Sequence, residues 1–391
     1  MDLTYIGDFT SPSGYARATR NHARALIEQD VKVYGRLTKH GRNDAELDSW
    51  WRDRMEGVLA PTDEEPRITL FHNTPEFYND INPAFYNIAY LTFECDRIPS
   101  WDHGGDPRMN WVRQLNRMSE IWTTAEFMKD VFHRSGVRTD IPINVFPHPI
   151  DLDLYSPEGG KMDFRDEKRK SIDNTFVFFS SFQWSKRKGP YELMLAFLSE
   201  FAAEEDAMLL IKTYSDGFTP QARKVVTDQL QGFKKYVRRE GGLARIRVML
   251  DNLPEDKLPE LYRSADAYVT STHGEGFGLP TQESMACGVP CIAPYSSAFP
   301  DYMNNDNGWL YKTHLEPVYG MQFPWYEVTM NWWRPDVPAL KSCMREAYEA
   351  RDDRLKEKGK CARTQIEKLH SFETVGVAMR KRLEQIEIDL H

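Results

Sequence analysis

Short runs of strand-forming residues alternate with amphipathic stretches along the first half of the chain. The runs at 3–9, 31–35, 67–72, 87–94, 120–125 and 143–148 each predict a strand. Between the first two, residues 15–29 place Ala16, Ala23 and Leu26 on one helical face. We expect the arginines of this helix, Arg17 and Arg20, to be mostly solvated. This alternation is typical of parallel sheets covered by helices.

The second half of the chain repeats the pattern. The runs at 176–182, 207–214, 245–250, 267–272 and 290–295 predict strands, separated by helices such as 191–204 and 256–265. The chain is helical from 338 onward, and its last helix, 374–390, has one apolar face made of Val377, Met379, Leu383 and Ile386. The polar segment 156–175 predicts a domain boundary. We therefore predict an α/β protein with two facing Rossmann-like, doubly wound parallel-sheet domains. Ligands of such sheets bind at the carboxyl ends of the strands, here in a deep cleft between the domains.

Composition narrows the class of protein. Of 391 residues, 41% are hydrophobic, which excludes wholesale disorder, and the net charge of −9 disfavours a nucleic-acid partner. No run approaches the roughly 18 to 20 apolar residues of a membrane span, and the start MDLTYIGDF does not resemble a signal peptide. The five cysteines form no CxxC pair, and we expect Cys287 and Cys291 to be buried. The expected location is the cytoplasm, with peripheral contact at the inner face of the membrane left open.

The segment 273–290 carries the clearest candidate chemistry. Three glycines, at positions 274, 276 and 278, let the backbone approach a ligand, and Pro280 suits the first turn of a helix. We expect the amides of residues 277–281 to converge on a phosphate at this helix N-terminus. Glu275 and Glu283 flank the site and can accept hydrogen bonds from sugar hydroxyls. Spacing alone leaves open a tight turn with a capping carboxylate.

The stretch GEGFGLPTQESMACGVPCIA resembles the Glu-x7-Glu signature region of family 4 glycosyltransferases. FVFFSSFQWSKRKGPYELMLAF is similar to the strand–loop–helix of that family that ends in Lys-Gly, and NVFPHPIDLDLYSP to the segment that closes its first domain. The segments TFECDRIPSW and EIWTTAEFMKDVFHRSGV resemble acceptor-domain segments of one branch. The resemblance implies a retaining enzyme with the GT-B fold. It implies an acceptor domain at 1–158, a nucleotide-sugar domain at 159–370 and a final helix, 371–391, that crosses back to the first domain.

The resemblance also implies roles for individual residues. Glu283 would bind the ribose of the nucleotide, Glu275 the transferred sugar, and Lys188 the diphosphate. The family commonly has an arginine where this chain has Gln183, which leaves open whether Arg187 or Lys186 supplies the second positive charge. Glu275, Lys188 and Arg187 are thus the candidate catalytic residues. Further donor contacts are expected at Ser181, Gly276, Phe277, Gly278, Leu279, Asn252 and Leu253.

The chemistry of sugar transfer needs positive charge near the leaving diphosphate, either from a metal ion or from fixed cations and helix amides. The basic residues 186–188 follow a strand directly, whereas the Asp-x-Asp motif, Asp151 to Asp153, lies in a hinge-like segment where capping is expected. We therefore predict catalysis without a metal and without a cofactor. No side chain is an obvious nucleophile, so departure and attack on the same face of the sugar is preferred over a covalent adduct on Glu275.

The predicted first domain offers weaker candidates. Gly14 precedes a helix and can present backbone amides to the diphosphate, although a plain turn is the alternative. His72, Glu94 and His148 end strands and are candidate acceptor contacts, with structural histidines and an Arg97 ion pair as the other interpretations.

The sequence thus predicts a glycosyltransferase of polysaccharide or glycolipid synthesis that transfers a sugar from a UDP- or GDP-sugar to a hydroxyl of a glycan or glycolipid intermediate. No nucleic-acid partner is expected. The alternatives are an enzyme that glycosylates modified nucleic acid and an inactive nucleotide-sugar-binding protein. The acceptor, the linkage and the oligomeric state stay open.

Overall fold

The computed structural model describes residues 1–38, 47–62, 64–162, 175–215, 217–321, 325–351 and 353–390. Most of the polar segment 156–175, where a boundary was expected, lies outside them. The chain divides into two compact units. Unit 1 comprises Met1–Asp151, Gln322–Asn331 and Lys368–His391, and unit 2 comprises Leu152–Met321 and Trp332–Glu367. The first change of unit thus comes at residue 151, slightly before the expected division at 158, and residues 322–331 return to unit 1.

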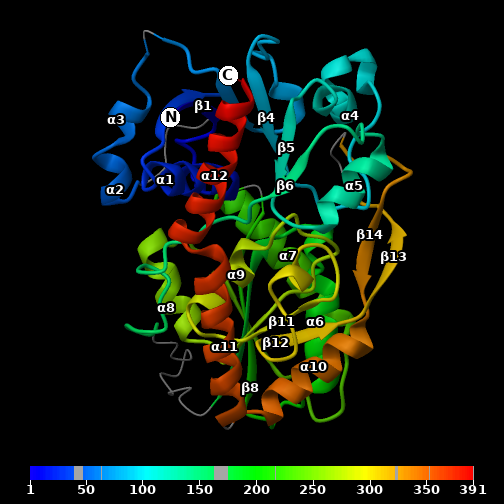
Figure 1. Cartoon of the computed structure of the whole chain (residues 1–391). Coiled ribbons are helices and arrows are strands. Elements are labelled where there is room, and N and C mark those ends of the chain that lie inside the picture. Colours follow the sequence, from blue (N-terminus) through cyan, green and yellow to red (C-terminus); the bar gives the residue numbers. More distant parts are fainter. Residues whose placement is uncertain are drawn as a thin grey trace. The chain divides into compact units, whose positions relative to one another are not determined.

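Unit 1 contains a six-stranded parallel sheet in the order β2-β1-β3-β4-β5-β6. Figure 1 labels four of these strands, β1, β4, β5 and β6. Its strands are β1 (Asp2–Gly7), β2 (Lys32–Leu37), β3 (Ile68–His72), β4 (Tyr86–Tyr90), β5 (Glu120–Thr123) and β6 (Ile143–Val145). Its helices are α1 (Gly14–Ile27), α2 (Ser49–Arg52), α3 (Met55–Val58), α4 (Trp111–Leu115), α5 (Phe127–Ser135) and α12 (Phe372–Leu390). The six runs of the first half thus form the expected strands.

The last helix, α12, packs against α1 within unit 1. Met379, Leu383 and Ile386 are fully buried in the core of this unit, as the apolar pattern indicated. The prediction was wrong for the remaining residue of that face, because Val377 is 49% exposed and Val375 is buried instead. Gly376 allows the close contact, because a Cβ there would lie 2.4 Å from the carbonyl oxygen of Ala25.

Unit 2 contains a second six-stranded sheet, in the order β12-β11-β10-β7-β8-β9, and all the strand pairs recorded in it are parallel. The strands are β7 (Phe176–Gln183), β8 (Ala207–Tyr214), β9 (Arg245–Met249), β10 (Ala267–Val269), β11 (Cys291–Pro294) and β12 (Gly308–Tyr311). A separate pair, β13 (Thr313–Pro317) with β14 (Asn331–Pro335), was not predicted. The helices are α6 (Pro190–Glu200), α7 (Pro220–Tyr236), α8 (Leu258–Arg263), α9 (Leu279–Ala286), α10 (Val337–Glu349) and α11 (Asp353–His370), which ends in unit 1.

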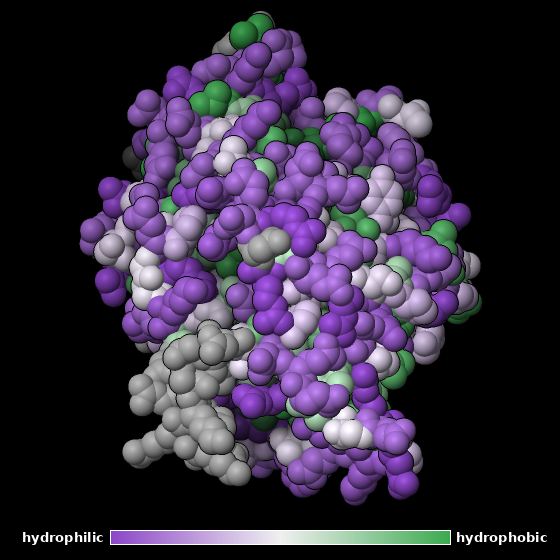
Figure 2. Space-filling view, turned by 90° about the horizontal axis from the view of Figure 1, so that it is seen from below, coloured by the Kyte–Doolittle hydropathy of each residue, from purple (hydrophilic) through white to green (hydrophobic). Residues whose placement is uncertain are grey.

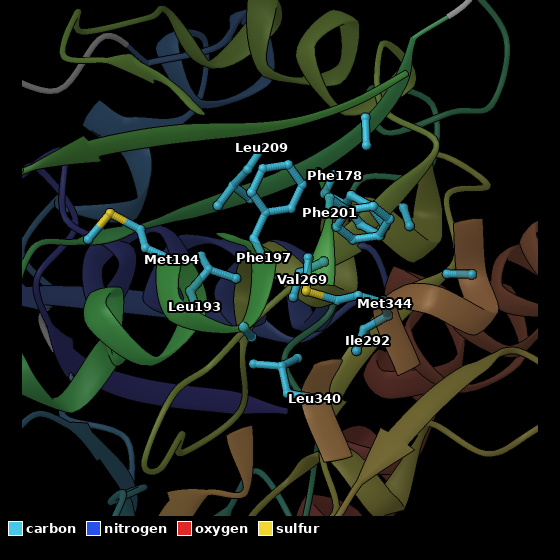
Figure 3. Packing of buried hydrophobic residues seen from close by; sticks show 14 of the residues in the cluster. Phe178, Leu193, Met194, Phe197, Phe201, Leu209, Val269, Ile292, Leu340 and Met344 are labelled. Carbon is cyan, nitrogen blue, oxygen red and sulfur yellow. The ribbon is translucent and has the colours of Figure 1, made fainter. Parts of the chain in front are cut away.

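The core of unit 2 explains why its central strands read as continuous apolar runs. Phe178 and Leu209 from the sheet meet Phe197 and Phe201 from α6 and its end, and Met344 comes from α10 (Figure 3). Strands buried on both faces by helices need no polar alternation, which is the pattern of a parallel sheet in an α/β fold. The two sheets with their flanking helices confirm the predicted two-domain, Rossmann-like α/β class.

The surface is largely polar on the face that Figure 2 shows, where hydrophobic residues form small scattered groups among hydrophilic ones. Within the part of the chain that the structure describes, no helix is both long and apolar enough to cross a membrane.

Candidate active site

A glycine-rich loop joins β10 to α9 and shapes the start of that helix. Gly278 has φ +94°, and a Cβ there would lie 2.8 Å from the Phe299 ring, so only glycine fits. The amides of Thr281 and Gln282 donate to the Gly278 carbonyl at 3.0 and 3.1 Å. Because Pro280 has no N–H and the Thr281 amide is already bonded, neither residue supplies a donor to the anion site expected at residues 277–281.

The basic segment 186–188 lies beside this loop and is joined to it by hydrogen bonds. Gly189 follows with φ +63°, and a Cβ there would lie 2.1 Å from the carbonyl oxygen of Ser271. The Ser271 hydroxyl donates to the carbonyl oxygens of Lys188 at 3.1 Å and Gly189 at 2.8 Å. The His273 amide donates to the Arg187 carbonyl at 2.7 Å. The backbone thus fixes the two loops relative to each other.

Glu275 forms ion pairs with two cations of that segment. Lys188 Nζ donates to Glu275 Oε1, and Arg187 Nη1 lies 3.5 Å from Glu275 Oε2. Arg187 also donates to the Gly274 carbonyl at 2.8 Å. Burial raises the pKa of the Glu275 carboxyl, but Lys188 and Arg187 outweigh it, and the pKa lies below its usual value. Glu275 is therefore charged at neutral pH.

The third cation, Lys186, is held elsewhere. Its Nζ donates to Glu192 Oε1 at 2.9 Å, so Arg187, and not Lys186, is the cation that accompanies Lys188 at Glu275. His273 lies close to this ion pair. Its Nε2 is 3.7 Å from Glu192 Oε1 and 3.5 Å from Glu316 Oε1. Burial lowers the pKa of His273 to about 4 despite the nearby Glu192, so the ring is neutral at pH 7.

Glu283 lies in α9 and is only 4% exposed. Its Oε2 accepts a hydrogen bond of 2.6 Å from the Tyr262 hydroxyl. Glu283 also interacts electrostatically with the buried Lys212 of β8. Burial lowers the pKa of Lys212, and the charge of Glu283 raises it in part. Sequence reasoning missed both partners. A lone lysine inside the apolar run AMLLIKTY was the available signal for Lys212.

The remaining donor candidates of unit 2 lie at the ends of strands. Ser181 is half-buried in β7, and its carbonyl accepts from the Tyr268 hydroxyl at 3.2 Å. Gln183, at the end of the same strand, is exposed and donates to the Ser215 carbonyl at 3.4 Å. Asn252 is exposed and Leu253 half-buried in the turn after β9. Gly276, Phe277 and Leu279 line the loop and helix start described above.

In unit 1, Gly14 is exposed at the first position of α1, and Ser13 caps that helix by accepting from the Ala16 amide at 3.0 Å. The preceding loop is held by Asp8, whose carboxylate accepts from the amides of Thr10 and Ser11. The expectation for Arg20 was wrong. Its side chain is buried, and it donates to the carbonyl oxygens of Phe9 and Ser11 at 3.0 and 3.1 Å. These hydrogen bonds hold the loop against α1.

The two candidate histidines of unit 1 lie among buried aromatic rings. His72 is 1% exposed and its Nδ1 shares a hydrogen bond of 2.8 Å with the Tyr5 hydroxyl. His148 is 5% exposed, and its Nδ1 lies 3.4 Å from the Tyr90 hydroxyl. Burial lowers the pKa of both, so they are neutral at pH 7. These contacts suit a structural role better than a ligand contact.

Glu94 is half-buried after β4, and it accepts a hydrogen bond from the Tyr326 hydroxyl. Arg97, the alternative partner considered for it, donates instead to the Arg134 carbonyl. The Asp-x-Asp motif also has a structural contact, since Arg24 donates to Asp151 at 2.7 Å. Cys287 and Cys291 are buried as expected, and burial raises the pKa of Cys287 to about 12.

Residues 163–317 match the family described as "Glycosyl transferases group 1". A D-inositol 3-phosphate glycosyltransferase of Acidothermus cellulolyticus is 26% identical over 177 residues, which are 45% of this chain and 37% of the relative. That of Thermomonospora curvata is 40% identical over 180 residues, 44% of this chain and 40% of the relative. The chain thus matches less than half of the length of these relatives.

Solved structures resemble the whole chain at low sequence identity. HepE of Anabaena, solved with UDP, has a TM-score of 0.65 at 14% identity, with 98% of this chain and 100% of HepE covered. Sucrose-phosphate synthase of Thermosynechococcus elongatus has a TM-score of 0.69 at 15% identity, and each chain is covered completely. The fold is therefore GT-B. Within that fold, residues 163–317 resemble the group 1 glycosyl transferases, and the relatives matched in sequence are glycosyltransferases as well.

Proposed function

We propose that the protein is a retaining glycosyltransferase that transfers a hexosyl group from a nucleotide-diphosphate sugar to a hydroxyl of a glycan or glycolipid intermediate. The observation that carries this proposal is the ion-pair cluster of Glu275 with Lys188 and Arg187 beside the start of α9. Two fixed cations and a helix N-terminus together suit a diphosphate. The HepE structures with UDP and with UDP-glucose favour UDP over GDP as the donor base.

Glu283 would bind the hydroxyls of the ribose. The Tyr262 hydroxyl fixes the orientation of that carboxylate by donating to Oε2. Because the side chain is buried, hydrogen bonds from the ribose hydroxyls to Glu283 would form in a low-dielectric environment. A ligand that left this carboxylate unpaired would therefore bind less tightly.

Transfer breaks the bond between the anomeric carbon and a diphosphate oxygen, and negative charge grows on the leaving group. Lys188 and Arg187 would share their positive charge between Glu275 and the diphosphate, with the loop amides 277–279 as further donors. These groups can stabilise the leaving oxygen without a metal. Glu275 would then face the transferred sugar as a charged group that supports the positive anomeric carbon, and not as a nucleophile.

Retention would follow from attack on the face from which the diphosphate leaves. The acceptor oxygen forms the new bond to the anomeric carbon, and its proton passes to the departing diphosphate oxygen. No side-chain base is needed in this step.

The proposal is tested by donor binding and turnover. UDP at 100 times its dissociation constant should stabilise the fold by about 2.7 kcal/mol, seen as a rise in Tm. A UDP-sugar should be hydrolysed slowly without an acceptor, with release of the α-anomer and no effect of EDTA. Glu283→Ala should abolish the shift in Tm, whereas Lys224→Ala, in an exposed ion pair of α7, should not.

Each outcome addresses a separate part of the proposal. If neither UDP nor GDP raises Tm, the nucleotide-sugar donor is wrong. Release of the inverted anomer would contradict retention, and loss of turnover in EDTA would contradict metal independence.

A further inference from the structure

Aromatic and acidic side chains gather beyond the carboxyl ends of β3 and β4 in unit 1. Glu76 lies in the 3₁₀ turn Pro75–Phe77, just after β3, and Glu94 lies just after β4. Trp111 packs against Phe93 with ring centroids 5.3 Å apart and against Trp325 at 6.5 Å. Ligands of parallel sheets bind at this end of the strands.

The rings of Trp325 and Tyr326 belong to residues 325–331, a segment of unit 1 that lies in the sequence between the two parts of unit 2. Tyr326 packs on Phe93, with centroids 5.9 Å apart, and donates its hydroxyl to Glu94. Glu327 accepts from the amides of Ser100 and Trp101 at 2.5 and 3.2 Å. The Asn331 amide donates to Asp96 at 2.6 Å. These bonds hold both ends of the segment in place.

Two buried polar atoms in this region, the Tyr15 hydroxyl and Asn73 Nδ2, form no hydrogen bond with any residue that the structure describes. Glu76 and Trp111 lie close enough to interact with each other. Trp111 and Asn73 are only 2% and 5% exposed. Buried polar groups are nearly always paired, because leaving them unpaired costs free energy. Two unpaired groups of this kind in one region therefore indicate a ligand that offers hydrogen-bond partners to them.

Tyr15, Glu76 and Trp111 are related by their electrostatic interactions. Burial raises the pKa of Glu76, while interactions with Thr74, Trp111 and Trp325 lower it in part. Burial raises the pKa of Tyr15 as well, and the charges of Glu76 and Glu94 raise it further. Tyr15 thus lies near both carboxylates.

We propose that these residues form a subsite for a neutral sugar of the acceptor, a proposal that rests on the function proposed above. The acceptor cluster is defined as Tyr15, Asn73, Glu76, Glu94, Trp111 and Tyr326. Sugar hydroxyls both donate and accept, which suits the carboxylates, the indole N–H, the phenol and the amide. The aromatic rings suit the apolar C–H face of a pyranose.

The charge of the acceptor cluster distinguishes between acceptors. Its six residues include two acids and no base, so it would repel a phosphate and accept an uncharged ring. The relatives described as D-inositol 3-phosphate glycosyltransferases are named for a phosphorylated acceptor. This chain is therefore expected to differ from them in acceptor chemistry.

Saturation-transfer NMR on the full chain tests the subsite with methyl α-glucoside, methyl α-mannoside, methyl α-galactoside, methyl N-acetylglucosaminide and inositol 1-phosphate as probes. At least one neutral glycoside should bind at millimolar concentration, and inositol 1-phosphate should not compete with it. Tyr15→Phe and Glu76→Gln should weaken the glycoside at least fivefold. Trp101→Phe is the control, because Trp101 lies in the same unit and is 63% exposed; it should change affinity less than twofold.

Tyr15→Phe keeps the test decisive, because it removes a hydroxyl without a protein partner and should leave Tm unchanged while sugar affinity falls. The subsite proposal is wrong if no neutral glycoside binds, if only inositol 1-phosphate binds, or if both variants bind normally. UDP binding is measured on the same samples. Its loss would count against the proposed function alone, since glycoside binding that depends on Tyr15 and Glu76 would still support the subsite.

Discussion

Arg382 of α12 binds Glu120 of β5 through two nitrogens. Its Nε lies 3.0 and 3.1 Å from the two carboxylate oxygens, and its Nη2 lies 2.6 Å from Oε2. The Glu120 side chain is completely buried and also accepts from Trp122, Tyr86 and Asn144. A buried carboxylate with this many donors is fully satisfied, and it fixes the last helix to the sheet of unit 1.

Replacing Arg382 should therefore destabilise the protein. Arg382→Met would leave a buried carboxylate without its cation, and we expect a loss of about 3 kcal/mol in the free energy of unfolding. Urea denaturation measures it. Glu384→Gln is the matched control on the same helix, because the exposed Arg380–Glu384 pair should contribute at most about 0.5 kcal/mol. Equal effects of the two variants would show that the buried pair is not special.

Gly189 should tolerate no side chain. Gly189→Ala would force the backbone out of its left-handed conformation and away from the Ser271 carbonyl, at a cost of roughly 2 to 3 kcal/mol. Because the same turn carries Lys188, UDP affinity should fall as well. Gly57→Ala in α3 meets no atom within 4 Å and should be neutral or slightly stabilising. Thermal unfolding of both variants, with and without UDP, makes the comparison.

Acid should weaken the fold well above the range in which carboxylates titrate. Burial lowers the pKa of His22 and His273 to about 4 and that of His370 to about 3, and it also lowers those of His72 and His148. The unfolded chain takes up these protons near pH 6.5 and the folded chain does not. The stability that these neutral histidines contribute is therefore fully present above pH 6.5 and is lost as the pH drops from 6.5 to 4.

One histidine can be isolated from that pH dependence. Each buried neutral histidine contributes up to about 1.4 kcal/mol per pH unit in this window. His22→Gln should therefore reduce the slope of unfolding free energy against pH by roughly that amount, as measured by urea denaturation at pH 6.5, 5.5 and 4.5. An unchanged slope would mean that His22 is protonated in the folded protein.

Tyr262 is expected to act on donor binding through Glu283. Tyr262→Phe removes the hydrogen bond to Oε2, and UDP affinity should fall about tenfold, equivalent to about 1.4 kcal/mol. Isothermal titration calorimetry measures it. Tyr295→Phe, at a tyrosine of unit 2 that is 64% exposed, should bind UDP normally. Normal binding by Tyr262→Phe would place the ribose away from this pair.

The strands of both sheets and the glycine-lined loop could be predicted because they depend on local patterns. Apolar runs such as FVFFSSF mark doubly covered strands, and three closely spaced glycines before a proline mark a helix start. The pairing of Glu275 with Lys188 could not be predicted, because it depends on how two loops far apart in sequence are joined through Ser271.

The misses have similar physical causes. Arg20 is buried because its guanidinium finds carbonyl partners in a loop, which no helical periodicity records. The segment 325–331 is polar and aromatic without regular spacing, so its contacts with Glu94 and Asp96 left no pattern in the sequence. Tyr262 and Lys212 acquire their roles only from their distance to Glu283.

The order in which the ribosome makes the two units follows from how they share the chain. Residues 1–151 emerge first, but the core of unit 1 also contains Val375, Met379, Leu383 and Ile386. These side chains leave the exit tunnel only after the last residue of unit 2, Glu367. Of the two units, the one whose first residues are translated earlier is therefore the later one to complete its hydrophobic core.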